Sequence, residues 1–207
     1  MESTTSIIKR GLNILDICAD SSQIQMWIDH LYYLKEWNQV FNMTRITEFD
    51  LMIKKHLFDI LSVSPFILGE NIIDVGSGGG LPGIPLAILY PLKKFYLIEK
   101  SKKKCIFLEY VIRKLSLSNA VVICSRIEEY KETIFFDAVI ARAFSNIVTI
   151  VKLCRKFIRT GGRIYAMKSS YKTEIKNLNK QGFSYDVCQI RVPFSENFLR
   201  HLITIKC

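Results

Sequence analysis

A glycine-rich segment constrains the fold of this chain more than any other feature of the sequence. It extends from Asp74 to Gly83, holds five glycines and begins at the end of the apolar run at residues 72–75. Glycine permits positive φ and lets the backbone approach a ligand with no Cβ in the way. Ligands of open α/β sheets bind at the carboxyl ends of the strands. The segment therefore predicts a ligand-binding bend that leaves the first strand of a parallel sheet.

After residue 70, short β-branched runs alternate with helical stretches, an order typical of βα units. The predicted strands lie at residues 72–75, 95–98, 120–123, 136–140, 161–167, 185–192 and 201–206. The clearest helix follows Ser101, a predicted cap, and has Cys105, Leu108 and Ile112 on one face. The last two strands are expected to pair at the sheet edge. Together these elements predict an α/β fold with a mostly parallel seven-stranded sheet and helices on both faces.

The first 63 residues have a helical pattern instead. Apolar residues recur at three- and four-residue steps after Ser22, a predicted cap, and again over residues 47–61. His56 lies on the apolar face of the second helix, where a hydrogen-bonded core histidine is the ordinary interpretation. A chain of 207 residues suits one domain. We therefore expect a helical extension at residues 1–65, packed on an α/β domain at residues 66–207 as one structural unit.

Two cofactor classes use a glycine bend at this position. The dinucleotide pattern G-x-G-x-x-G, started at Gly76, requires Gly or Ala at position 81, which holds Leu81. The pattern that fits in phase is D-x-G-x-G-x-G, which resembles motif I of class I methyltransferases, with Asp74 accepting hydrogen bonds near the methionine end. Glu99, at the end of the second strand, is placed to accept both ribose hydroxyls of an adenosyl group, as it would for NAD. S-adenosylmethionine is the favoured cofactor, and a nicotinamide-dependent oxidoreductase is the alternative.

The charge of the chain indicates a polyanionic partner. The formal net charge is +10, and such a surface attracts nucleic acid or anionic membrane. Lys102, Lys103 and Lys104 occupy the first turn of a predicted helix, where the macrodipole disfavours cations. Contact with RNA phosphates would explain these three lysines, and a solvated surface is the alternative.

The cysteines and the N-terminus bear on the compartment. The six cysteines are widely spaced and lack the close pairs of a zinc site, so reduced thiols and no bound metal are expected. The chain begins without a basic stretch followed by an apolar block, and it has no apolar run of the length that spans a bilayer. We expect a cytoplasmic protein without membrane attachment.

Several segments together resemble one family, the RsmG/GidB family of bacterial 16S rRNA guanine-N7 methyltransferases. They are D-V-G-S-G-G-G-L-P-G-I-P at residues 74–85, Trp37-Asn38 with Asn42-Met43-Thr44, His56 with Asp59, S-R-I-E-E at residues 125–129, A-R-A-F at residues 141–144, Met167-Lys168, and R-H-L at residues 200–202. The resemblance covers about residues 27–206. The sequence departs from the family's usual residues at Met43, Gly79, Glu99 and Ser169.

The resemblance implies a class I methyltransferase with a Rossmann-like fold that uses S-adenosylmethionine. The implied reaction methylates N7 of a guanine in the 530-region loop of 16S rRNA, position 527 in the usual numbering. The implied partner is 16S rRNA or the 30S ribosomal subunit. A class I methyltransferase that acts on another RNA or on a protein is the alternative. We expect a monomer as the simplest assembly.

The resemblance also carries site residues. It assigns cofactor contacts to Gly76, Leu81, Ile127, Glu128 and Arg142. The residue pattern itself adds Asp74, Gly78 and Glu99. For Arg142 a structural ion pair is the alternative. The match suggests a shared RNA-facing or fold-stabilising role for Lys168, Arg200 and His201. Guanine N7 carries a lone pair and no proton, so no general acid, base or nucleophile is assigned.

Overall fold

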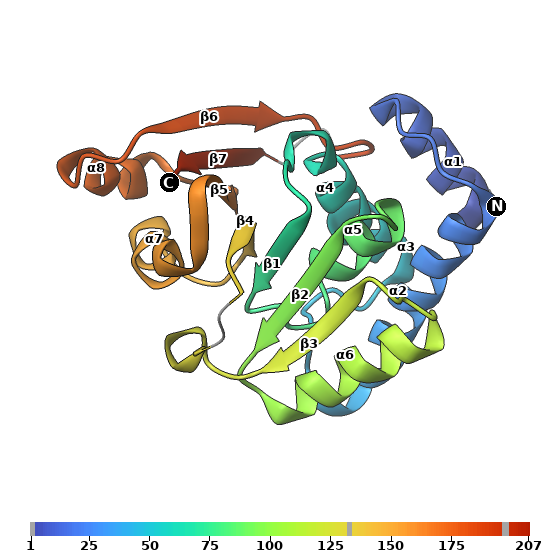
Figure 1. Cartoon of the computed structure of the whole chain (residues 1–207). Helices are drawn as coiled ribbons and strands as arrows, with labels where there is room; N and C mark the ends of the chain where they lie inside the picture. Colours follow the sequence, from blue (N-terminus) through green and yellow to red (C-terminus); the bar gives the residue numbers. More distant parts are fainter. Residues whose placement is uncertain (1–2, 132–133, 196–198) are drawn as a thin grey trace.

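The computed structural model describes residues 3–131, 134–195 and 199–207. Within them, seven strands form one sheet in the order β3-β2-β1-β4-β5-β7-β6 (Figure 1). The strands are β1 (Asn71–Val75), β2 (Lys94–Glu99), β3 (Ala120–Cys124), β4 (Phe136–Arg142), β5 (Ile158–Lys168), β6 (Tyr185–Ile190) and β7 (Arg200–Lys206). β1 to β5 pair in parallel, whereas β7 is antiparallel to both of its neighbours. The prediction of a mostly parallel seven-stranded sheet is confirmed.

The two C-terminal strands do not both lie at the sheet edge, as a terminal hairpin-like pair would suggest. β7 lies between β5 and β6, so of this pair only β6 is an edge strand. The register pairs Lys168 on β5 with His201 on β7. This pairing brings the end of β5 beside the start of β7, although the two residues are far apart in the sequence.

Helices cover both faces of the sheet. They are α1 (Thr4–Leu15), α2 (Ser21–Phe41), α3 (Phe49–Met52), α4 (Phe58–Leu61), α5 (Gly83–Leu89), α6 (Lys102–Lys114), α7 (Ile147–Cys154) and α8 (Lys172–Lys180). Alternate strand residues point to opposite faces. Ile72 and Leu97 therefore join the core beneath α1, α2, α5 and α6, while Ile73 and Ile98 join the core beneath α7 and α8 (Figure 1).

The N-terminal helices differ in detail from the prediction. Asp20, rather than Ser22, caps α2: its carboxylate accepts the N–H of Gln23, and the Gln23 side chain accepts the N–H of Asp20. The predicted helix at residues 47–61 consists of α3, a π-helical turn at Ile53–Leu57 and α4. Such wide turns are frequent at functional sites.

Helix α2 is bonded directly to the glycine segment and to α5. The Trp27 indole donates to the carbonyl of Pro85 at 3.1 Å, and the Gln23 amide donates to the carbonyl of Ile88 at 2.7 Å. His30 Nε2 lies 2.9 Å from the Gly79 carbonyl, and burial lowers the pKa of this histidine to about 4. Neutral His30 therefore donates to the bend. Among the described helices, none combines the length and apolarity that crossing a bilayer requires.

Candidate functional site

The glycine segment forms a tight bend at the carboxyl end of β1. The backbone has positive φ values at Gly76 (+73°), Gly78 (+56°) and Gly80 (+79°), which residues with a side chain rarely adopt. The N–H of Gly76 donates to the Ile98 carbonyl at 2.9 Å, which ties the bend to β2. A Cβ added at Gly78 would meet only the Gly76 carbonyl, at 3.8 Å. The bend therefore faces open space at Gly78.

Glu99 holds the bend from the end of β2. It is 6% exposed, and its two oxygens accept the N–H groups of Gly78 at 3.0 Å and of Ser101 at 2.9 Å. Ser101 is the N-cap residue of α6, as predicted, but its side chain makes no cap hydrogen bond. A carboxylate has about four acceptor positions. Glu99 thus keeps acceptors for a ligand while its carboxylate is fixed by backbone.

Asp74 lies beneath the bend. It is 1% exposed, and one carboxyl oxygen accepts the N–H of Gly83 at 2.9 Å, at the start of α5. The other oxygen is buried with no hydrogen-bond partner among the described residues. Burial raises the pKa of Asp74 to about 7. Asp74 therefore supports the bend from below, and the cofactor contact that the sequence suggested for it stays a prediction.

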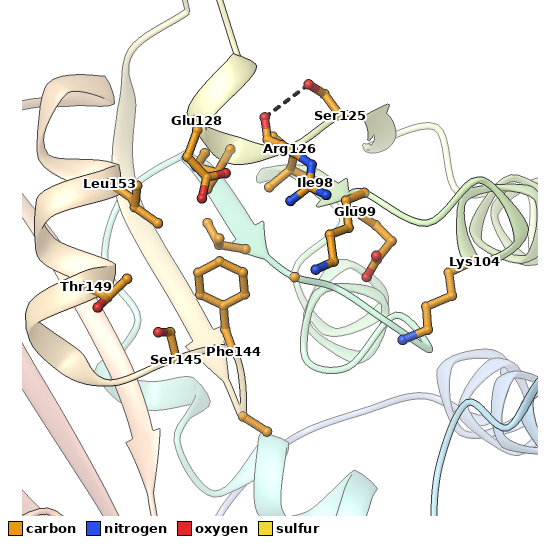
Figure 2. Close-up of a pocket in the computed structure, with 15 residues that line it drawn as sticks. Ile98, Glu99, Lys104, Ser125, Arg126, Glu128, Phe144, Ser145, Thr149 and Leu153 are labelled. Carbon is orange, nitrogen blue, oxygen red and sulfur yellow. Dashed lines mark hydrogen bonds between the residues drawn. The ribbon is translucent and has the colours of Figure 1, made fainter.

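Two neighbouring cavities open at this edge of the sheet. The first has a volume of about 370 Å³, and Figure 2 shows Glu99, Glu128 and Phe144 around it. Ile127 and Gly76 also line it, so four of the predicted cofactor residues meet here: Gly76, Glu99, Ile127 and Glu128. The sequence did not single out Phe144 for this cavity, although it stands in the A-R-A-F segment.

The second cavity has a volume of about 690 Å³. Predicted cofactor residues that line it are Gly76, Gly78, Leu81 and Arg142. The two cavities share Gly76, Lys104 and Ala143 in their walls. Gly78 and Glu99 contribute to different cavities but are joined by the hydrogen bond between them. The bend therefore separates two adjoining spaces.

A buried ion cluster forms one wall of the second cavity. Asp59 on α4 is fully buried and accepts bonds from Arg142 at the end of β4 and from Arg200 at the start of β7. Arg142 also donates to the Lys55 carbonyl at 3.0 Å and lies 2.9 Å from His56 Nδ1. This geometry matches the structural ion pair that was the alternative for Arg142. His56 is 6% exposed and hydrogen-bonded, like a core histidine, yet it lines the cavity.

The three predicted RNA residues near the strand ends differ in exposure. Arg200 is 7% exposed and paired with Asp59, which fits the fold-stabilising role. Lys168 donates to the Ser145 carbonyl at 2.6 Å and pairs with Glu174 at 3.0 Å. His201 is half-buried, with its ring centroid 4.5 Å from that of Tyr171. RNA contact by these residues stays a prediction.

Three lysines form the first turn of α6, which contributes to the walls of both cavities. Lys102 and Lys103 are exposed, and Lys104 lines both cavities. The second cavity has five cationic residues in its wall, Arg45, Lys104, Arg142, Lys168 and Arg200, against one carboxylate, Glu174. This edge of the sheet therefore presents positive charge. In the described part of the chain, no group of three or more His, Cys, Asp or Glu side chains is placed to hold a metal ion.

Comparison with known proteins agrees with this geometry. The family model for rRNA small subunit methyltransferase G, GidB, matches residues 23–203. The protein is 43% identical over 199 residues to the ribosomal RNA small subunit methyltransferase G of Francisella tularensis subsp. tularensis strain WY96-3418, with 96% of this chain and 95% of the relative covered. The protein of the same name from Francisella philomiragia subsp. philomiragia is 41% identical and covers 100% of this chain and 99% of its own.

Solved structures share the fold at low identity. A fibrillarin pre-rRNA processing protein from Methanococcus jannaschii aligns with a TM-score of 0.57 at 15% identity, over 72% of this chain and 73% of its own. The precorrin-6y C5,15-methyltransferase of Geobacter metallireducens GS-15 has a TM-score of 0.56 at 14% identity, over 72% and 88%. The class I methyltransferase fold is confirmed, and the nicotinamide-dependent alternative finds no support. The chain belongs to the rRNA small subunit methyltransferase G (GidB) family.

Proposed function

We propose that the protein transfers a methyl group from S-adenosylmethionine to N7 of a guanine in 16S rRNA, at position 527 in the 530-region loop. The observation that carries the proposal is the pair of cavities that meet at Gly76, Lys104 and Ala143. One has the acceptors for a nucleoside, and the other has a cationic wall suited to RNA. Family membership supports the same reaction.

The residues of the first cavity fit S-adenosylmethionine. Glu99 offers free acceptor positions for the two ribose hydroxyls, and Ile127 and Glu128 stand where an adenine ring would lie. The methionine part would follow the bend at Gly78, where no side chain fills the space, and pass Gly76, against which the Phe144 ring packs. Bound there, the cofactor supplies an electrophilic methyl group on a sulfonium.

The side chains of the site position the reactants. Guanine N7 has a lone pair and no proton, so the reaction requires alignment rather than proton removal. His56 is the histidine in the wall of the second cavity, and burial lowers its pKa to about 3. Neutral His56 is hydrogen-bonded to Thr44 and Arg142, so its role is to fix the positions of these side chains. The proposed reaction therefore uses no general base.

The RNA would approach from the cationic edge. Lys102 and Lys103 are exposed and directly precede Lys104, and Arg45 and Lys104 line the second cavity. Cations in such a position attract phosphates and orient the strand, although they do not read its sequence. We propose 16S rRNA, naked or within the 30S subunit, as the partner, and a monomer as the acting form.

The decisive test measures methyl transfer by the purified protein. 30S subunits and naked 16S rRNA from cells that lack their own enzyme are incubated with labelled S-adenosylmethionine, and the modified nucleotide is mapped by mass spectrometry. N7-methylguanosine in the 530-region loop is the expected product. Transfer only to another RNA or to a protein would support the alternative substrates. Calorimetry with S-adenosylhomocysteine and NAD checks the cofactor, and only the first should bind.

A further inference from the structure

Thr44 occupies a rigid position in the wall of the second cavity. It lies in the loop between α2 and α3, where its N–H donates to the Asn38 side chain at 2.7 Å. The hydroxyl oxygen of Thr44 accepts the N–H of Ile46 at 3.1 Å and lies 2.9 Å from His56 Nε2. The orientation of this hydroxyl therefore depends on which nitrogen of His56 carries the proton.

Arg142 determines that tautomer. Its Nη2 lies 2.9 Å from His56 Nδ1, and a guanidinium can only donate hydrogen bonds. Nδ1 is also 3.3 Å from the Lys55 carbonyl, but that carbonyl accepts from Arg142 at 3.0 Å. A proton on Nδ1 would face the guanidinium N–H directly. Burial, with the charge of Arg142, lowers the pKa of His56 to about 3, so the ring is neutral and its proton is on Nε2.

With this tautomer the Thr44 oxygen has no free lone pair. A hydroxyl has two acceptor positions and one donor hydrogen. The N–H of Ile46 and Nε2–H of His56 occupy both acceptor positions, so the only remaining bonding group is the hydroxyl hydrogen. No acceptor for that hydrogen is found among the described residues. Thr44 thus presents a single obligatory donor at the wall of the second cavity.

We propose that Thr44 is a specificity-determining residue that donates its hydroxyl hydrogen to O6 of the target guanine. The inference rests on the proposed function, because O6 and N7 are neighbouring acceptors on one edge of guanine. Adenine also has a lone pair at N7 but carries an amino donor in place of O6. Two donors would then face each other, and a buried group left unpaired weakens binding far more than a merely absent contact.

The same chain of contacts gives Arg142 a positioning role. Asp59 fixes Arg142, Arg142 fixes the His56 tautomer, and His56 fills the second lone pair of Thr44. Without Arg142 the ring could place its proton on either nitrogen, and Thr44 could then accept as well as donate. The ion cluster would in this way turn an ambiguous hydroxyl into a selective one.

The test compares Thr44→Val with Thr44→Ser on guanine-bearing 30S subunits that lack the modification. Valine keeps the shape without the hydroxyl, and serine keeps the hydroxyl. We expect Thr44→Val to lower kcat/KM about tenfold, the loss of one hydrogen bond in the transition state. Thr44→Ser should stay within about threefold of the unchanged protein. Affinity for S-adenosylhomocysteine should be unchanged in both variants. The melting temperature should be unchanged in Thr44→Ser and lower in Thr44→Val, because the N–H of Ile46 and Nε2–H of His56 lose their acceptor.

A second measurement uses the unchanged protein on 30S subunits that carry adenine at the target position. Loss of at least about a hundredfold in kcat/KM is expected, because a site built to hydrogen-bond one group rejects an analogue that lacks it, by about 10⁴-fold or more in favourable cases. Full activity of Thr44→Val, equal losses in both variants, or equal transfer to adenine would each overturn the inference. The adenine result still decides if Thr44→Val does not fold. No transfer to guanine by the unchanged protein would instead refute the proposed function.

Discussion

Two buried carboxyl groups lie near the second cavity, and their surroundings differ. Asp59 is 0% exposed and is bonded to the guanidinium groups of Arg142 and Arg200. Asp74 is 1% exposed, is bonded to the N–H of Gly83 and has one oxygen without a hydrogen-bond partner among the described residues. The charge of Asp59 is compensated by two cations that are distant in the sequence. Asp74 is instead hydrogen-bonded to a backbone N–H close to it in the sequence.

The difference shows two ways of building a wall for a binding site. Around Asp59, charge compensation joins α4, β4 and β7 into a stable cluster, because both guanidiniums need the carboxylate and the carboxylate needs them. Around Asp74 the local bend is ordered, but burial raises its pKa to about 7, so the ionised form is destabilising in the folded protein. The fold therefore disfavours a negative charge on Asp74, whereas two guanidinium groups compensate the charge of Asp59.

Asp59→Asn gives the largest expected effect on this comparison. The variant leaves Arg142 and Arg200 without a compensating negative charge in a buried position. Breaking a buried pair in this way costs roughly 3–5 kcal/mol, so the free energy of unfolding should fall by about that amount. Denaturant titration followed by circular dichroism measures it.

Asp186→Asn is the matched control, because Asp186 pairs with Lys206 at an exposed position. A solvent-exposed pair contributes little, and this variant should unfold like the unchanged protein. Equal, small effects of both substitutions would mean that Asp59 is not the centre of a buried cluster, and the contrast with Asp74 would disappear.

Asp74→Asn should act in the opposite direction, and its effect should depend on pH. The pKa of Asp74 is near 3.8 in the unfolded chain and about 7 in the folded protein. As pH rises from 4 to 7, the unfolded chain releases this proton while the folded protein keeps it, so stability is lost over that window. Above pH 7 the asparagine variant should be more stable by up to about 4 kcal/mol, at about 1.4 kcal/mol for each pH unit.

The measurement is the free energy of unfolding of both proteins at several pH values between 4 and 8. The difference between the two curves isolates Asp74 from the other titrating groups. At pH 4 the two proteins should be nearly equal, and the asparagine variant should gain steadily above it. A difference that does not change with pH would show that Asp74 ionises normally beneath the bend.

The glycine side of this comparison could be predicted from the sequence, because its contacts are local or join adjacent strands. Asp74, Gly76 and Gly78 follow one another, and Glu99 ends the neighbouring strand, so parallel pairing alone brings them together. The mostly parallel sheet could also be predicted, because alternating strand and helix patterns place successive strands in parallel. The helix caps were harder to predict, since Asp20 is followed by two serines, which are equally ordinary cap residues.

The ion cluster could not be predicted in this way. The H-x-x-D segment singled out His56 and Asp59, but Arg142 is 83 residues from Asp59 and Arg200 is 141 residues away. No local pattern says which cation a buried carboxylate will meet. The role proposed for Thr44 could not be predicted for the same reason, because it depends on a tautomer of His56 that Arg142 sets from the end of β4.

Gly78→Asp tests the glycine bend directly. The substitution places a charged side chain in the open space at Gly78 and should weaken S-adenosylhomocysteine binding at least about a hundredfold, about 3 kcal/mol, by calorimetry. Gly161→Asp is the control, because Gly161 also has positive φ, +80°, and open space around its Cβ position but lines neither cavity of the site. Both variants should remain folded. Undiminished binding in Gly78→Asp would place the cofactor elsewhere.

Glu99→Gln should weaken S-adenosylhomocysteine binding at the glycine bend less than Gly78→Asp does. Glutamine keeps one oxygen acceptor but turns an amide donor toward the N–H of Gly78 or of Ser101, which both now donate to the carboxylate. Loss of a charge-assisted bond to the ribose should weaken S-adenosylhomocysteine about tenfold. Glu129→Gln, one residue beyond the cavity wall, is the control and should bind normally. Similar affinities for all three proteins would remove Glu99 from the proposed cofactor site.

The two exposed lysines that precede Lys104 in α6 should give the smallest effect. Lys102 and Lys103 lie in the first turn of α6, where their charges oppose the helix dipole, so a double Lys→Gln change should leave stability equal or slightly higher. If these lysines contact phosphates, the KM for 30S subunits should rise about threefold and its salt dependence should weaken. The control pair is Lys94 and Lys206, which are exposed near the amino ends of the parallel strands, away from the site. Equal salt dependence in both double variants would mean that the charge at the start of α6 acts on RNA no more than charge elsewhere on the surface.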